Sequence, residues 1–279
     1  MLRQRVITAL VLAGGFLGVL FGAPATVFLG LMALVVAYAA WEWSALAAIE
    51  SGLGRGLYVL LAAGLMAALA AYFRFDKQSL IEPHISIFLV WAAGWWALAL
   101  LWVQSYPASA LLWGRSWIGA LMGLMVLLPT WTAMAVLIHA PRGPWLVLGV
   151  VVLVALADIG AFFTGRAFGH HKLAVKVSPG KTWEGLGGGM AAITLAVLVF
   201  ITVAAPAGQW WAWLLLVLIT GLASVLGDLV ESMVKRHRGV KDSGAILPGH
   251  GGILDRVDSL TAALPVFTLL YILLHPKLW

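Results

Sequence analysis

Residues 210–227, WWAWLLLVLITGLASVLG, form a run without a charged side chain that approaches the length needed to cross a bilayer. A second uncharged run extends from Pro144 to Ala157. Hydrophobic residues make up 63% of the 279-residue chain and charged residues only 10%, whereas about 25% are charged in a typical soluble domain. These features predict an all-α, polytopic integral membrane protein.

Charged and Pro/Gly-rich stretches divide the hydrophobic sequence into about nine predicted transmembrane helices. Residues 1–140 would hold five helices that act as a scaffold. Residues 141–279 would hold four catalytic helices with basic cytoplasmic loops. The expected helices are Val6–Phe21, Ala25–Ile49, Gly56–Tyr72, Ile85–Val103, Trp117–His139, Pro144–Gly165, Gly185–Ala205, Trp210–Val234 and Ile253–His275.

The positions of the basic residues predict the orientation of these helices. With the N-terminus in the cytoplasm, thirteen of the seventeen Lys and Arg residues lie on the cytoplasmic side, as the positive-inside rule favours. The net charge of +6 is then explained by orientation and anionic lipid headgroups, and we expect no nucleic-acid partner. The N-terminal segment imitates a signal peptide, but its apolar run is long and Pro24 interrupts the cleavage site, so we expect an uncleaved helix.

Acidic residues gather at the predicted cytoplasmic ends of three helices: Asp158 on one, Asp228 and Glu231 on the next, and Asp255 and Asp258 on the last. A carboxylate within a membrane helix costs about 2.5–3.5 kcal/mol, so it tends to be paired or functional. Each pair is spaced i,i+3 and shares one helix face. Neighbouring acidic faces repel each other unless cations lie between them. Oxygen ligands in a chain without cysteine favour Mg²⁺, although a salt bridge would explain any one of these acids alone.

The first half of the chain offers few chemically informative residues, and we interpret Glu42 as an ordinary interfacial glutamate. In the second half, basic residues interleave with acids and glycines in KDSGAILPGHGGILDR, residues 241–256. Glycines immediately before a helix let the backbone approach a ligand, and helix N-termini favour anions. Metal, basic residues and a helix N-terminus together suit phosphoryl or nucleotidyl transfer. His250 could be a general base, a phosphate donor or a residue that holds the turn.

The stretch SPGKTWEG, residues 178–185, ends like a P-loop but lacks its first glycine, because Val175 occupies that position. A basic loop precedes it in place of a buried strand. We interpret Ser178 as a helix N-cap followed by Pro179 at the first helical position, so that this stretch opens the seventh span. Its backbone amides and Lys181 would then bind phosphate at a helix N-terminus, and Ser178, Lys181 and Thr182 are candidate substrate-binding residues.

Two segments, SMVKR at 232–236 and KDSGAILPGHGGILDRVD at 241–258, closely resemble the signature of the bacterial phosphatidate cytidylyltransferase family, also called CDP-diacylglycerol synthases. DIGAFFTGRAFG, which begins at Asp158, and SPGKTWEG are similar to further stretches of that family. The resemblance covers the whole chain, strongly after Asp158 and only in hydropathy before it. The one departure is Ile159, where a small polar residue is usual.

The resemblance implies that phosphatidic acid and CTP react to give CDP-diacylglycerol and pyrophosphate, with Mg²⁺ required and K⁺ as a possible second cation. It also implies a homodimer in the bacterial inner membrane, with a site facing the cytoplasm and the membrane lipid. Asp228 and Asp255 match the family's metal ligands, and Ser232, Lys235 and Arg236 match its phosphate contacts. The remaining candidates for substrate binding are Lys181, Lys241, Asp242, His250, Arg256 and Asp258.

Three other readings compete with this one. An ion-coupled transporter would place its acids near the bilayer midplane and would contain interrupted helices. A CDP-alcohol phosphotransferase would carry a different aspartate motif, which this sequence lacks. A structural scaffold would leave the interleaved Lys-Asp and Asp-Arg pairs unexplained.

Overall fold

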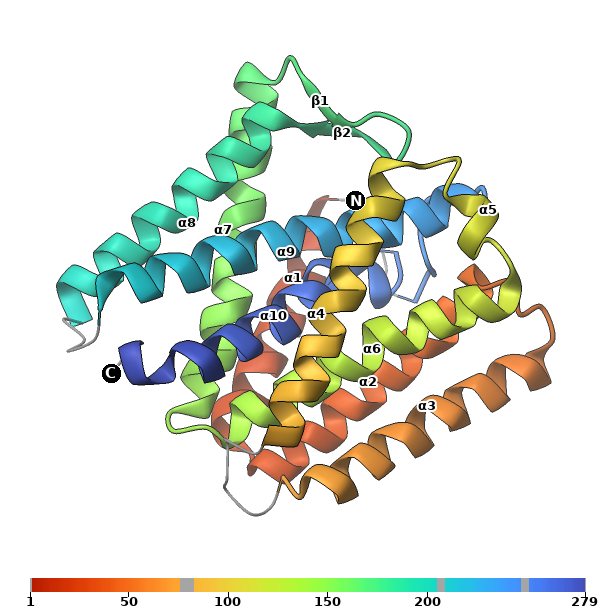
Figure 1. Ribbon diagram of the computed structural model, residues 1–279, viewed down its shortest axis with the longest axis horizontal. Helices are drawn as coiled ribbons and strands as arrows, with labels where there is room; N and C mark the ends of the chain where they lie inside the picture. The colour runs from red at the N-terminus through yellow and green to blue at the C-terminus, as the bar shows by residue number, and fades with distance from the viewer. Residues whose placement is uncertain (1, 76–82, 205–208, 247–250, 279) are drawn as a thin grey trace.

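The structure, a computed structural model, describes residues 2–75, 83–204, 209–246 and 251–278. Within these residues it is a helical bundle that carries one small β hairpin (Figure 1). The long helices are α1 (Leu2–Gly22), α2 (Ala25–Leu46), α3 (Gly52–Phe73), α4 (Pro83–Gln104), α6 (Ser116–His139), α7 (Gly143–Phe168), α8 (Trp183–Ala204), α9 (Trp210–His237) and α10 (Leu254–Leu278).

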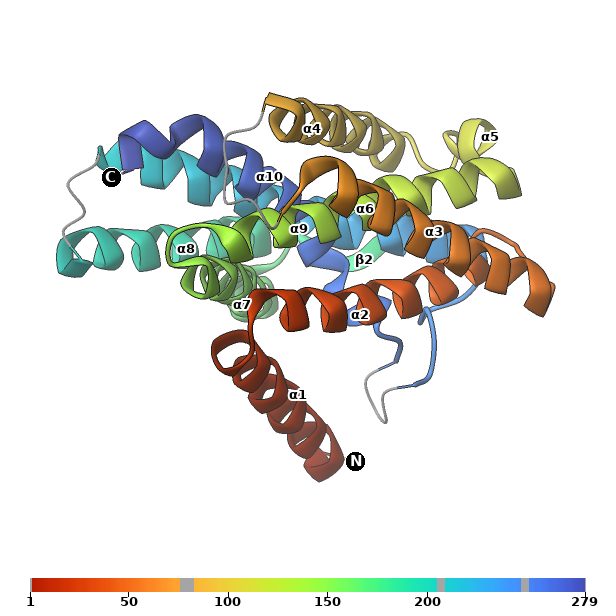
Figure 2. The same cartoon turned by 90° about the horizontal axis from the view of Figure 1, so that it is seen from below.

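The predicted all-α membrane fold is confirmed: eight of the described helices, α2 to α4 and α6 to α10, are long and apolar enough to cross a bilayer. The predicted first span corresponds to α1, whose apolar part, Ile7–Gly22, is shorter than the other eight. Figure 2 shows α1 leaving the bundle at an angle, with only its C-terminal end close to the other helices.

The bundle has two distinct ends. Figure 1 shows the β hairpin and the short helix α5 (Ala110–Trp113) toward the top and right, and the C-terminus on the opposite side. The hairpin and α5 both belong to connections that the basic residues assign to the cytoplasm, and the C-terminus is predicted to lie outside. The order of the helices along the chain is therefore consistent with the alternating topology expected from the sequence.

The prediction that a helix opens at Ser178 is wrong. Residues Ser178–Thr182 form strand β2, which pairs antiparallel with β1 (Lys172–Ala174), and α8 begins only at Trp183. A two-stranded ribbon tolerates Pro179 because both strands are edges, where a missing N–H need not break a ladder. Thr182 provides the cap instead, since its Oγ1 accepts a hydrogen bond from the Gly185 N–H at 3.1 Å.

The hairpin is attached to both neighbouring helices. The Trp183 N–H donates to the His171 carbonyl at 2.9 Å, and His171 Nδ1 lies 2.6 Å from Glu184 Oε1 on α8. From α9, Arg236 Nε donates to the Val177 carbonyl at 3.2 Å. These contacts fix β2 across the ends of α8 and α9, which is where the site described below lies.

Small residues determine how closely α7 and α8 pack. A side chain at Gly189 would collide with the Ala157 carbonyl, and one at Gly188 would collide with Thr164, so α7 and α8 pack almost backbone to backbone. Helix α10 packs against α9 and also against α6, where Thr130 Oγ1 donates to the Thr261 carbonyl at 3.0 Å. The proposed division at residue 140 stays a prediction, and the two parts share an extensive packed interface.

Candidate active site

The predicted acidic residues of α9 and α10 face one another at one end of the bundle. Gly227 makes this approach possible, because a side chain there would collide with the backbone carbonyl of Asp258. Asp228, which follows Gly227, is near enough to Asp258 for their charges to interact, and Glu231 also interacts with Asp258. The two acidic faces, each expected from its i,i+3 spacing, therefore lie near each other.

A lysine lies between the two acidic faces. Lys235 Nζ lies 2.7 Å from Asp255 Oδ1 and 3.0 Å from Glu231 Oε1. The side chains of this group are almost fully buried, with 9% of Lys235, 6% of Asp255 and 2% of Glu231 exposed. Neither oxygen of Glu231 has a hydrogen-bond donor in good geometry among the described residues. One ammonium group thus contacts two buried carboxyl groups, those of Asp255 and Glu231.

A second lysine reaches the site from the hairpin. Lys181 Nζ, on β2, lies 2.6 Å from Asp228 Oδ2 on α9. The other oxygen of Asp228, Oδ1, accepts a hydrogen bond from Ser232 Oγ at 3.1 Å. About a quarter of each charged side chain is exposed, 25% for Lys181 and 27% for Asp228. The hairpin, unrecognised in the sequence, is therefore the element that places Lys181 in the site.

The glycine-rich segment before α10 is held by two carboxylates. Asp255 Oδ2 accepts hydrogen bonds from the backbone N–H groups of Ser243 and Gly252, each at 2.9 Å. Glu42 on α2 accepts from the N–H groups of Ile253 at 3.1 Å and Leu254 at 2.8 Å. The interpretation of Glu42 as an ordinary interfacial residue is therefore wrong. Its position inside an apolar span was the one signal that could have identified it.

A cavity of about 510 Å³ opens beside the Lys181–Asp228 pair. Asp158 and Arg166 of α7 line it together with Lys181, and Phe162 and Leu186 give it an apolar wall. Asp158 interacts electrostatically with both Lys181 and Asp228. The sequence had placed Asp158 in the predicted acidic cluster but had assigned it no role as a metal ligand or substrate contact.

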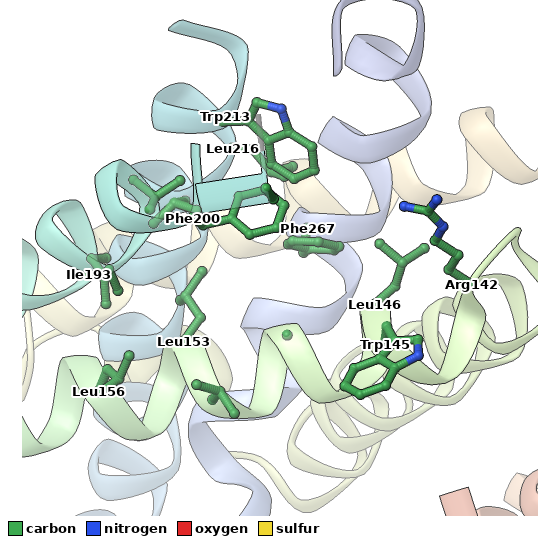
Figure 3. Close-up of a pocket in the computed structure, with 16 residues that line it drawn as sticks. Arg142, Trp145, Leu146, Leu153, Leu156, Ile193, Phe200, Trp213, Leu216 and Phe267 are labelled. Atoms are coloured by element: carbon green, nitrogen blue, oxygen red, sulfur yellow. The ribbon is translucent and has the colours of Figure 1, made fainter. Parts of the chain in front are cut away.

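A separate cavity of about 610 Å³ lies between α7, α8, α9 and α10, away from these acids. Figure 3 shows its lining, in which Leu153, Phe200 and Phe267 point inward and Arg142 stands at one end. None of the described residues that line it carries a carboxyl group. It therefore offers a place for hydrocarbon and lacks the groups needed for nucleotide chemistry.

The other candidate residues are distributed around this centre. Thr182 is buried, and its hydroxyl caps α8; Ser178 is half-buried at the start of β2. Arg236 binds backbone carbonyls, while Lys241, Asp242 and Arg256 are exposed. His250 lies outside the described residues. The structure thus brings together Lys181, Asp228, Ser232, Lys235, Asp255 and Asp258, and substrate roles for all the candidates stay predictions.

The carboxyl oxygens of this site can be compared with the ligands that Mg²⁺ requires. Five carboxyl groups lie close together here, those of Asp158, Asp228, Glu231, Asp255 and Asp258. Among the described residues, the cations that form ion pairs with them are Lys181 and Lys235. Carboxyl oxygens outnumber the lysines that contact them among the described residues, and oxygen ligands suit a hard divalent cation. Within the same residues, no three His, Asp or Glu side chains form a group that could hold an ion alone. The residues therefore fit Mg²⁺ if substrate phosphates and water complete its coordination, which is how Mg²⁺ is commonly bound.

Comparison with known proteins supports an enzymatic site. The model of the cytidylyltransferase family matches residues 3–274. The chain is 45% identical over 277 residues to a protein of Pseudomonas aeruginosa named phosphatidate cytidylyltransferase, with 97% of each chain covered. It is 41% identical over 287 residues to a protein of the same name from Haemophilus influenzae, covering 97% of this chain and 99% of the relative. A Brucella melitensis protein of that name is 51% identical over 124 residues, 44% of this chain and 45% of the relative.

Proposed function

The chain belongs to the cytidylyltransferase family, and from this premise we propose that it transfers a cytidylyl group from CTP to phosphatidic acid in a metal-assisted, in-line reaction at the cytoplasmic membrane face. The products would be CDP-diacylglycerol and pyrophosphate. The observation that carries the proposal is the pair of lysine–aspartate contacts, Lys181–Asp228 and Lys235–Asp255, at one end of a membrane-embedded bundle.

The location of the site suits the two substrates. CTP is highly charged and soluble, whereas phosphatidic acid stays in the membrane with its phosphate at the surface. A site at the ends of α7, α9 and α10, beside a cavity with both charged and apolar walls, can receive both molecules. A transporter would need its acids nearer the middle of the spans, so the same placement argues against that alternative.

In the proposed reaction an oxygen of the lipid phosphate attacks the α-phosphorus of CTP. A new P–O bond forms, and the bond from the α-phosphorus to the oxygen bridging it to the β-phosphate breaks, so that pyrophosphate leaves with that electron pair. The attacking oxygen is already ionised, so no strong base is needed. The protein's contribution is then positioning and charge neutralisation, with Lys181 as an accessible cation beside the cavity.

Asp228 and Asp255 are the proposed Mg²⁺ ligands. The ion would supply positive charge that draws the substrate phosphates together and stabilises the charge developing on them. Asp228 is the more available of the two, because Asp255 already accepts contacts from Lys235, Ser243 and Gly252. When the ion binds, Lys181 would leave Asp228 and contact a substrate phosphate instead. The second cation K⁺, the homodimer and the bacterial inner membrane as the location also remain proposals.

The purified protein, incubated in detergent with labelled CTP, tests the proposal. We expect labelled CDP-diacylglycerol with phosphatidic acid, none with diacylglycerol in its place, and none when Mg²⁺ is removed by a chelator. Product formed equally with the chelator would reject the metal. Absence of labelled lipid from folded, lipid-supplied protein would reject the cytidylyltransferase reaction, and a transport assay would follow.

A further inference from the structure

Glu42 belongs to the scaffold half of the chain, yet its carboxylate lies at the start of α10 in the catalytic half. It is buried, with 2% of its surface exposed. None of the ion pairs found in the described residues includes it. Its carboxylate oxygens accept hydrogen bonds from the backbone N–H groups of Ile253 and Leu254 and from the hydroxyl of Ser243, which lies 3.1 Å from Oε2.

Helix α10 has a physical need for this carboxylate. The residue just before it is Ile253, a hydrocarbon side chain that cannot accept a hydrogen bond, so the usual local N-cap is absent. The first N–H groups of a helix have no partner within the helix and carry partial positive charge. Glu42 accepts from two of the N–H groups at this end and is therefore a cap supplied by a residue about two hundred positions earlier in the chain.

Glu42 and Asp255 hold the same segment from two sides, and Ser243 links them. The Ser243 N–H donates to Asp255, and the Ser243 hydroxyl donates to Glu42. Side chains at Gly244 or Gly252 would collide with the Glu42 carboxylate, which explains two of the glycines in this segment. Asp255, which also contacts Lys235, thus shares Ser243 as a hydrogen-bond partner with a carboxylate that belongs to α2.

We propose that Glu42 is a positioning residue for the nucleotidyl-transfer site: it caps α10 and holds Ser243, Ile253 and Leu254, so that Asp255 is held ready to bind the metal and the substrate phosphates. The proposal rests on the proposed function for its effect on catalysis. The capping contact itself can be tested without the reaction. Glu42 would touch neither substrate nor metal, and it would act only through the backbone of this segment and through Asp255.

Glu42→Gln is the informative variant, because glutamine has nearly the same size but only one acceptor oxygen. Both oxygens of Glu42 accept hydrogen bonds, so the amide NH₂ of glutamine would face a donor. The matched control is Glu50→Gln, the same chemical change at an exposed position just after α2. Amide hydrogen exchange in wild type and both variants, read on peptides that cover residues 251–258, reports on the cap directly.

We expect exchange at 251–258 to be faster by roughly 5-fold or more in Glu42→Gln and unchanged in Glu50→Gln, since one lost cap of typical strength corresponds to about a 5-fold change in the opening equilibrium. In the CTP assay, Glu42→Gln should lower the rate at fixed Mg²⁺ and raise the Mg²⁺ concentration that gives half-maximal activity. Loss of packing alone would lower the rate without moving the Mg²⁺ requirement. The proposal would be overturned if residues 251–258 exchanged as slowly in Glu42→Gln as in the wild type. It would also be overturned if the wild type were active and Glu42→Gln had the same Mg²⁺ requirement.

Ser243→Ala provides a second route if Glu42→Gln does not fold. It removes the hydroxyl contact to Glu42 and leaves the backbone contact to Asp255 in place. The Mg²⁺ requirement should rise in the same direction but less, and no rise in an active Ser243→Ala protein would count against the proposal. A wild type without activity would reject the proposed function, while the exchange result would still decide whether Glu42 caps α10.

Discussion

The two lysine–aspartate pairs of the site are chemically alike but lie in different surroundings. Lys235 and Asp255 are almost fully buried, and Lys235 also contacts Glu231. Lys181 and Asp228 are each about one quarter exposed and border a cavity through Lys181. A buried pair that shares several partners is suited to holding helices in position. A pair that water and ligands can reach is suited to exchanging partners during a reaction.

Lys235→Met should have the largest effect on stability. It would leave Asp255 and Glu231 buried without their cation, and removing one member of a buried ion pair costs about 3–5 kcal/mol. Thermal unfolding of the purified protein, followed by helical circular dichroism, measures this loss. Lys172→Met, at an exposed position on β1, is the control and should unfold like the wild type. Equal unfolding temperatures for Lys235→Met and the control would show that the buried pair does not hold α9 and α10 together.

Lys181→Met should lower the reaction rate strongly but change the stability little. The pair it breaks is partly open to water, where an ion pair contributes about 0–1 kcal/mol, so unfolding should change little. Its rate of CDP-diacylglycerol formation should fall on the order of 100-fold, the usual effect of removing one charge-stabilising group from an active site. Kinetics at saturating CTP and phosphatidic acid make the comparison, again with Lys172→Met. A large loss of stability with a normal rate per folded molecule would assign Lys181 to structure.

Thr182→Val should have the smallest effect. It removes the hydroxyl that caps α8 beside Lys181, and a lost cap costs about 1 kcal/mol. Thr182→Ser keeps the hydroxyl and should unfold like the wild type. If Thr182→Val abolished activity without changing stability, the hydroxyl would belong to the substrate site, as the sequence first suggested.

The sequence predicted the helices well because uninterrupted hydrophobicity is a local property. The i,i+3 spacing also predicted that Asp228 and Glu231 share one helix face and that Asp255 and Asp258 share another, but not which acids approach each other across α9 and α10. The sequence did not reveal the hairpin, because SPGKT contains proline and glycine and lacks the alternation typical of a strand. The role of Glu42 could not be read from the sequence either, because capping across about two hundred residues depends on how α2 packs against the start of α10.

The sequence also could not show which cations lie between the two acidic faces. Repulsion between the faces indicated that positive charge must lie between them, and this inference did not require the fold. Which cation serves each acid depends on the placement of Lys181 by the hairpin and on the burial of Lys235 in α9. Among the described residues, the cations that contact these acids are lysines, and the Mg²⁺ stays a proposal.

The most direct test of the account is the rate of CDP-diacylglycerol formation by Asp228→Asn and Asp255→Asn, each measured beside its unfolding temperature, with Glu50→Gln as the control. We predict that both variants fall below about 1% of the wild-type rate, because both acids serve the reaction. Only Asp255→Asn should also unfold at a lower temperature, since only that acid belongs to the buried pair. Near wild-type product from folded Asp228→Asn would contradict the claim that nucleotidyl transfer occurs at the open lysine–aspartate pair.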